Sequence, residues 1–301
     1  MVTPKAKRAA LVHLVEAHRM SERRACRLLG APRSSMRYRA RPRDNEGVLR
    51  LLKTLAGRHR RSGYRQLTRM LRRRLGPVNH KRVHRLYRNH GLQVPVRRRR
   101  RLKHMPRQPM TVPRRRNECW SMDFVHDRTM TGPLRTLSVL DLCTRQAPVL
   151  TAARSMPSER VIRTLEQAAE AYGLPERIVV DNGPEFTSRS MQRWAKDHDI
   201  ELHFIEPGKP TQNAFIESFN ARLRDECLNE HVFSNVQEAQ AVLEQWRNYY
   251  NQERPHGSLR GQTPNEFAQG RERALLETLV RDRLRLLTLT RPEPCAADWD
   301  D

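Results

Sequence analysis

One short segment, Arg177-Ile-Val-Val-Asp181, most constrains the fold of this chain. Its three central residues are apolar and β-branched, so neither face of the segment suits contact with water. A strand that is apolar on both faces is typical of the centre of a sheet covered by helices on both sides. An acid ends the strand, and an Asn-Gly-Pro turn follows it. The segment therefore predicts a layered α/β domain with a carboxylate at the end of a buried strand.

The residues around this strand predict the rest of the domain. Apolar runs indicate three strands before it and one after it, at residues 119–125, 134–142, 147–153 and 201–205. Helical spacing of apolar residues falls at residues 158–172, 188–198 and from about 213 onward. Three strands, a helix, a strand, a helix, a strand and a helix is the order of the ribonuclease-H-like fold. We therefore expect an α/β ribonuclease-H-like catalytic core, with a mixed sheet and flanking helices.

Three acids occupy distinctive places in this pattern. Asp123 lies within a predicted strand, Asp181 at a strand end and Glu217 on a predicted helix. Singly, an Asp at a strand end is usually a turn former and a helical Glu is usually solvated. In the expected fold the three carboxylates meet at one sheet edge, where they would repel each other. Two Mg²⁺ ions, roughly 3.5–4 Å apart, would offset that repulsion and support phosphoryl transfer, with Mn²⁺ as a substitute. All three are therefore predicted as metal ligands and catalytic acids.

The N-terminal part of the chain differs from this predicted domain in net charge. Residues 1–116 hold 36 Lys and Arg against 4 Asp and Glu, a net of +32, whereas residues 117–301 hold 22 against 29, a net of −7. Solvated helix faces are the plain explanation of single basic residues. A net charge this high on one part of the chain indicates a polyanionic partner, and nucleic acid fits it best.

Two helix-turn-helix regions are expected in the basic part. Residues 1–43 show helical spacing interrupted near Gly30 and Pro32, and residues 44–92 contain three further helical patterns. In the last helix, capped by Asn79, the basic residues lie away from the apolar stripe. We expect that set to contact DNA phosphates or bases: Lys81, Arg82, Arg85 and Arg88.

Residues 93–116 are expected to form a basic linker, because prolines interrupt repeated arginines there. Five consecutive arginines are predicted to lie along a DNA backbone, with a nuclear-import signal as the rival interpretation: Arg97, Arg98, Arg99, Arg100 and Arg101. The sequence contains no run of about 18 apolar residues, so no transmembrane helix is expected. The five scattered cysteines predict reduced thiols and a cytoplasmic protein, not a disulfide framework.

Three strings of residues resemble a known family. They are Trp120-Ser-Met-Asp-Phe, Asp181-Asn-Gly-Pro-Glu-Phe, and the run from Gly208 through Glu217-Ser-Phe-Asn-Ala-Arg-Leu-Arg-Asp-Glu-Cys. Together they resemble bacterial insertion-sequence transposases of the "IS three" family, second-frame product (OrfB), in the retroviral-integrase superfamily of DDE enzymes. The resemblance covers roughly residues 45–268.

The resemblance implies specific roles. Asp123, Asp181 and Glu217 would be the metal-binding catalytic acids, and Arg224 and Lys209 would contact DNA. Ala221 stands where such proteins often have Gly. The implied partners are the element's terminal repeats, target DNA, an upstream-frame product as fusion or partner, and further copies of the chain on DNA. The implied location is the bacterial cytoplasm, associated with the nucleoid.

The sequence thus predicts a DNA transposase that cleaves strands at element ends and joins the freed 3′-OH to another phosphodiester. A DNA-binding regulator with an inactive core and a ribonuclease-H-type nuclease are the alternatives. The expected core spans residues 117–268, followed by a helix and an acidic tail at 269–301. Two strings near the end of the core, Trp246–Asn251 and Arg254–Leu259, suit either a helix with a packed turn or a DNA contact.

Overall fold

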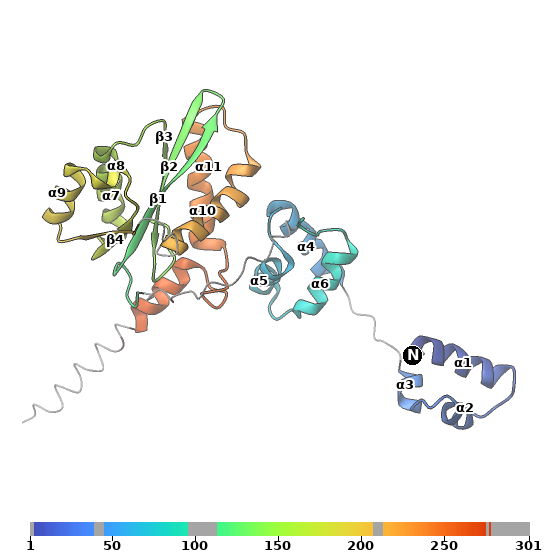
Figure 1. Ribbon diagram of the computed structural model, residues 1–301. Helices are drawn as coiled ribbons and strands as arrows, with labels where there is room; N and C mark the ends of the chain where they lie inside the picture. The colour runs from blue at the N-terminus through green and yellow to red at the C-terminus, as the bar shows by residue number, and fades with distance from the viewer. Residues whose placement is uncertain (1–2, 39–44, 96–112, 207–212, 275–276, 278–301) are drawn as a thin grey trace, which may run out of the picture. The chain divides into compact units, whose positions relative to one another are not determined.

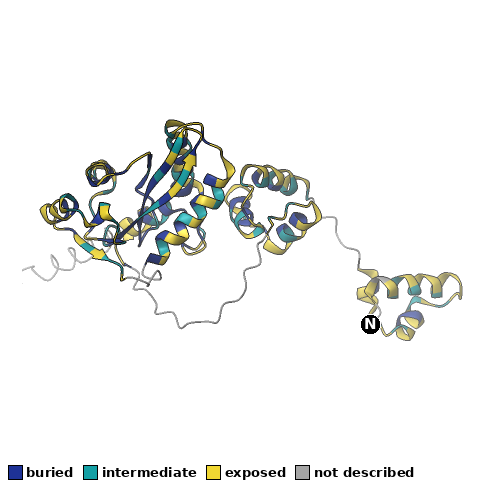
Figure 2. Ribbon diagram, turned by 45° about the horizontal axis from the view of Figure 1, so that its top comes forward, coloured by how far each residue is buried: buried dark blue, intermediate teal, exposed yellow. Residues whose placement is uncertain are grey.

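The computed structural model describes residues 3–38, 45–95, 113–206, 213–274 and 277. The chain divides into two compact units, residues 1–49 and 50–301, each of which is considered by itself. The first contains α1 (Pro4–Glu16), α2 (Glu22–Leu28) and α3 (Arg33–Arg37). Most of its residues are exposed (Figure 2). Its helices bury only a few side chains, Ala25, Cys26 and Met36 among them.

The second unit begins with a helical region, α4 (Glu46–Arg58), α5 (Tyr64–Leu75) and α6 (His80–Asn89) (Figure 1). Gly76 ends α5 with a φ of 77°, a conformation that suits glycine. The Asn79 side chain caps α6 by accepting a hydrogen bond of 2.8 Å from the Lys81 amide. The helices pack through apolar stripes whose buried members include Leu52, Leu55, Leu67, Leu71, Val83 and Leu86.

A five-stranded mixed sheet follows, in the order β3-β2-β1-β4-β5. Its strands are β1 (Trp120–Thr129), β2 (Gly132–Asp141), β3 (Val149–Ala153), β4 (Arg177–Val180) and β5 (Glu201–Phe204). The first three pair antiparallel, and β4 pairs parallel with both β1 and β5. The predicted α/β core with a mixed sheet is confirmed.

The largest difference from the predicted strand boundaries is at the end of the first strand. The strand expected at 119–125 continues to Thr129, where it turns into β2. The added residues, His126, Asp127 and Arg128, are polar, so their sequence gives no apolar signal. Their backbone groups nevertheless pair with β2 in a long antiparallel ladder, with His126 opposite Arg135.

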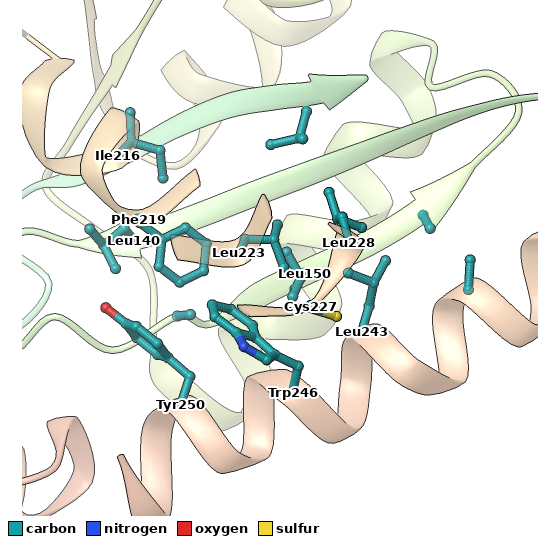
Figure 3. Packing of buried hydrophobic residues seen from close by; sticks show 14 of the residues in the cluster. Leu140, Leu150, Ile216, Phe219, Leu223, Cys227, Leu228, Leu243, Trp246 and Tyr250 are labelled. Atoms are coloured by element: carbon teal, nitrogen blue, oxygen red, sulfur yellow. The ribbon is translucent and has the colours of Figure 1, made fainter. Parts of the chain in front are cut away.

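Helices cover both faces of the sheet (Figure 1). On one face lie α7 (Ser158–Tyr172), the short α8 (Pro184–Thr187) and α9 (Arg189–Asp197), packed on residues such as Met122 and Val139. On the other face lie α10 (Ala214–Glu226) and α11 (Val236–Asn248). Their buried side chains form the cluster in Figure 3, where Phe219 meets Trp246 and Tyr250.

The chain leaves α11 through a π-helical turn, Tyr249–Glu253, and a packed segment, and residues 264–274 are again helical. Arg254 and His256 in that segment are both buried. This agrees with the packed turn predicted for Arg254–Leu259. The expected acidic tail lies outside the described residues.

Candidate active site

Asp123 is the most constrained of the three predicted acids. It lies in β1, where one carboxylate oxygen accepts a hydrogen bond of 2.8 Å from the Phe124 amide. The other oxygen accepts a bond of 2.8 Å from Asn220 Nδ2 on α10. Ser138 of β2 donates to Asn220 Oδ1 at 2.8 Å, which fixes the orientation of that amide. The carboxylate is therefore held from both its own strand and the facing helix.

The other two predicted acids act electrostatically on Asp123. Burial raises the pKa of the Asp123 carboxyl, and the nearby charges of Asp181 and Glu217 raise it further. The bonds from the Phe124 amide and from Asn220 act in the opposite direction. Acids far apart in sequence, on β1, after β4 and on α10, therefore repel one another across one edge of the sheet.

Asp181 follows β4 directly and begins a tight turn. Its Oδ1 accepts a hydrogen bond of 3.0 Å from the Gly183 amide. The neighbouring Asn182 donates from Nδ2 to the Ile205 carbonyl at 3.0 Å, which ties the turn to the end of β5. A Cβ at Gly183 would lie 2.9 Å from Asp181 Oδ1. The turn therefore fixes this carboxylate only because residue 183 has no side chain.

A fourth acid nearby, Glu185, is already paired. The guanidinium of Arg135 on β2 forms a partly buried ion pair with it, and this hydrogen bond lowers the pKa of the Glu185 carboxyl. Arg135 also lies over the Phe124 ring at 4.2 Å, and Phe124 stacks on Phe186 at 5.0 Å. Glu185 thus fastens α8 to the sheet beside Asp123 and Asp181, so it is not a free ligand.

Glu217 lies in the first turn of α10 and is exposed. The helix that carries it is anchored at its start, where Asn213 and Ser121 are hydrogen-bonded in the buried interior. Ile216, Phe219 and Leu223 bury the opposite face of the helix against the sheet. This fixed helix presents Glu217 and Asn220, three residues apart, toward the same side.

The chemistry of this site suits a hard divalent cation. The three carboxylates offer oxygen ligands, which Mg²⁺ and Mn²⁺ prefer to nitrogen or sulfur. Burial and the repulsion from Asp181 and Glu217 together raise the pKa of Asp123, and a bound cation would offset both. Within the described part of the chain, no three His, Cys, Asp or Glu side chains form a ready metal-binding group. The three acids therefore lie along the same sheet edge, but their side chains do not form a complete metal-binding group in this structure.

The predicted DNA contacts are only partly described. On α6, Lys81, Arg85 and Arg88 are exposed and Arg82 is half-buried, opposite the apolar stripe. Arg224 donates to the His126 carbonyl at 2.8 Å and lies 3.8 Å from an Asp127 oxygen, with its side chain 45% exposed. Lys209 and the five arginines Arg97, Arg98, Arg99, Arg100 and Arg101 lie outside the described residues.

Sequence reasoning missed Asn220 and Ser138. The signal for Asn220 was its place three residues after Glu217, on the same helix face. Ser138 had no such signal, because only the pairing of β1 with β2 places it opposite Asp123. No helix among the described residues has both the length and the apolar character needed to cross a bilayer.

Comparison with known proteins agrees with this fold. Two models described as "Integrase core domain" match residues 113–210 and 198–264, and one described as "HTH-like domain" matches residues 42–100. An uncharacterized 31.7 kDa protein of insertion element IS407 from Burkholderia multivorans is 44% identical, over 83% of this chain and 91% of that protein. A 39.2 kDa protein of IS476 from Xanthomonas euvesicatoria is 42% identical, over 89% of this chain and 78% of that protein.

A third relative carries a functional name. The transposase InsF of insertion sequence IS3A from Escherichia coli is 27% identical, over 79% of this chain and 76% of that protein. The helix-turn-helix-like region, the integrase core and these relatives agree with one another. The chain belongs to the insertion-sequence transposases of the "IS three" family, within the DDE integrase superfamily.

Proposed function

We propose that Asp123, Asp181 and Glu217 are the catalytic acids of this transposase. The observation that supports this most directly is electrostatic: burial raises the pKa of the Asp123 carboxyl, and the charges of Asp181 and Glu217 act on it in the same direction. The neighbouring acid Glu185 is instead paired with Arg135. A cluster of unpaired carboxylates at a sheet edge is suited to holding divalent cations.

The three carboxylates would bind two Mg²⁺ ions, which Mn²⁺ could replace. The bound cations would supply activation of the attacking oxygen and stabilisation of the leaving 3′ oxygen. Asn220 orients the Asp123 carboxylate, and the Gly183 amide orients that of Asp181. The protein thus contributes preorganised anionic ligands on rigid elements, and forms no covalent bond to the DNA.

The reaction proceeds as two displacements at phosphorus. In the first, a water oxygen bonds to phosphorus at the element's end and the P–O3′ bond breaks, leaving a free 3′-OH. In the second, that hydroxyl bonds to phosphorus in the target strand and releases another 3′ oxygen, which takes up a proton. The number of phosphodiester bonds is unchanged in the second displacement, so it needs no energy cofactor.

DNA recognition is assigned to the basic helical part. The exposed cations of α6 would contact the element's terminal repeats, together with the arginines at 97–101, and Arg224 and Lys209 would contact DNA near the acids. The resemblance further implies fusion or pairing with the upstream-frame product, and several copies acting together on DNA. This activity places the chain on DNA in the bacterial cytoplasm, at the nucleoid.

Cleavage of a labelled duplex carrying the DNA that flanks the gene tests the assignment of the acids. Asp123→Asn and Asp181→Asn are each expected to abolish metal-dependent nicking while leaving DNA binding in place. Glu170→Gln, which alters an exposed acid on α7, is the matched control and should nick as the wild type does. Nicking by both Asn variants at the wild-type rate would refute the assignment.

A further inference from the structure

A basic cavity lies on a second face of α10. Its volume is about 410 Å³, and its lining includes Arg145 from the turn after β2, Phe215, Ser218 and Arg222 from α10, and Arg254 and His256 from the packed segment after α11. Leu140 and Tyr250, labelled in Figure 3, line its apolar side. These residues are far apart in sequence, so the cavity is a product of the folded core.

The lining of the cavity is cationic and contains no acid. Four arginines contribute to it, Arg145, Arg222, Arg254 and Arg69 of α5, and no Asp or Glu is among its described lining residues. Arg254 is neutralised from behind by Glu226, in an ion pair with an N–O distance of 2.8 Å. For the other three, no carboxylate lies within ion-pair distance among the described residues. The cavity therefore has an excess of positive charge.

Arg145 is the cation that most clearly lacks a counter-charge. Its Nη1 is buried without a hydrogen-bond acceptor, and burial lowers the pKa of its guanidinium. The guanidinium lies over the Phe215 ring, 3.6 Å from its centre, and the backbone holds a φ of 63°. A partly buried cation that has no carboxylate partner, in a left-handed backbone conformation, is costly, so something in the functional state should compensate for it.

The nearest acid in the same turn cannot provide that compensation. Asp141 Oδ1 accepts hydrogen bonds from the Cys143 and Thr144 amides and from the Thr144 hydroxyl. Its Oδ2 accepts from the Asn117 amide at 2.8 Å. The Asp141 carboxylate therefore builds the turn that presents Arg145, and its oxygens are already occupied.

His256 forms part of the wall of the same cavity. The side chain is only 5% exposed, lines the cavity, and has a buried Nε2 without a hydrogen-bond partner. Burial, followed by the charges of Arg254 and Arg222, lowers the pKa of His256 to about 3. The ring is thus neutral, and its one N–H is directed to the Tyr250 backbone carbonyl, a contact that acts on the pKa in the opposite direction. The unpartnered Nε2 is therefore an acceptor, and the ring brings no charge of its own to the cavity. Gly257 also lets Arg69 approach the backbone, because a Cβ there would lie 3.0 Å from Arg69 Nη2.

We propose that this cavity is a binding site for a phosphate of the DNA backbone, with the guanidinium groups of Arg145 and Arg222 as its donors. A phosphodiester supplies the missing negative charge and the acceptors for the planar guanidinium groups. The proposal rests on the proposed function in its choice of DNA as the source of that phosphate. The Arg254–Leu259 segment then has a structural role, as part of the wall of this cavity.

The position of the cavity on α10 indicates which phosphate it would hold. Ser218, next to Glu217, and Arg222, one turn further, line the cavity, whereas Glu217 and Asn220 belong to the adjacent helix face. A helix is about 10 Å across, which corresponds to about three base-pair steps of 3.4 Å. The bound phosphate would therefore lie a few nucleotides from the reacting bond and set the position of the strand over the acids.

Binding measured without metal separates this proposal from the catalytic one. A fluorescein-labelled duplex of the flanking DNA is titrated with the full chain in EDTA over a range of salt concentrations. Arg145→Gln and Arg222→Gln are each expected to weaken binding about tenfold and to reduce the log–log salt slope by about 0.9, the effect of one lost phosphate contact. Arg163→Gln, an exposed arginine on α7, is the matched control and should leave both unchanged.

Thermal unfolding without DNA distinguishes a ligand site from a structural one. Arg145→Gln is expected to leave the Tm unchanged or higher, because it removes a buried cation that lacks a partner. A lower Tm together with a wild-type salt slope would overturn the proposal in favour of a structural role. If inorganic phosphate raises the Tm of the wild type but the variants bind DNA normally, the cavity holds small anions and the DNA assignment is wrong. Loss of nicking in the acid variants has no bearing on either readout.

Discussion

Gly183→Ala should displace the Asp181 carboxylate, and so reduce the rate of strand cleavage, without lowering the stability of the fold. Gly183 precedes α8 with a φ of −60° and a ψ of 144°, values that alanine adopts freely. The substitution therefore introduces no backbone strain, and such a change stabilises a protein by about 0.4–1 kcal/mol through the unfolded chain. The new methyl group, however, would lie 2.9 Å from Asp181 Oδ1.

The size of the effect follows from that distance. Ordinary contacts of a Cβ begin at about 3.4 Å, so the carboxylate or the turn must move by roughly 0.5 Å. The buried ring of Phe186 lies 3.6 Å from the same Cβ, so the new methyl group has little room to shift away from the carboxylate. Because a displacement of about 1 Å can reduce a rate about 100-fold, we expect strand cleavage to fall by about ten- to 100-fold.

Nicking of the labelled flanking duplex with Mg²⁺ measures the rate, and thermal unfolding measures the stability. Gly270→Ala is the matched control: it lies in the helix at residues 264–274, and its added Cβ meets nothing within 4 Å. The control should gain stability and keep its activity. If Gly183→Ala cleaved at the wild-type rate, or lost activity only because it unfolded, the account of the turn would be wrong.

Three further predictions concern the supports of the site. Asn220→Ala removes a hydrogen bond to a charged acid, worth about 1.5–3 kcal/mol, and should slow nicking about ten- to 100-fold with little change in Tm; unchanged nicking would contradict it. Glu226→Gln leaves Arg254 buried without its partner and should lower the free energy of unfolding by about 3–5 kcal/mol in urea titrations, whereas a loss below about 1 kcal/mol would show that the pair is not needed. Burial lowers the pKa of His256 to about 3 in the folded protein, against about 6.5 in the unfolded chain, so the unfolded chain takes up a proton below pH 6.5 and the folded protein does not. The free energy of unfolding should therefore fall by about 2 kcal/mol between pH 7 and pH 5, and His256→Gln should show a smaller fall.

The sequence predicted those parts of the site that depend on local order. Asp181 was placed correctly because three β-branched residues and a turn motif surround it within one short segment. Glu217 was placed on a helix because the apolar spacing of Ile216, Phe219 and Leu223 is local as well. The shared sheet edge was predictable only through the order of elements, which matches one known fold.

The parts that the sequence did not predict depend on contacts between distant segments. Glu185 belongs to the same motif as Asp181, but its partner Arg135 lies on another strand. Ser138 becomes a support of Asp123 only through the register of β1 with β2. The basic cavity combines Arg145 with His256, more than a hundred positions later, and no periodicity connects residues at such a separation.

The central claim is that the acids at this sheet edge join DNA strands, and strand joining tests it most directly. The assay uses the chain fused to its upstream-frame product, labelled DNA with the gene's own flanking ends, and Mg²⁺, with Glu217→Gln measured alongside. The account predicts joined product from the wild type, dependent on the metal, and none from Glu217→Gln, although both bind the DNA equally. Metal-dependent joining by Glu217→Gln would contradict it.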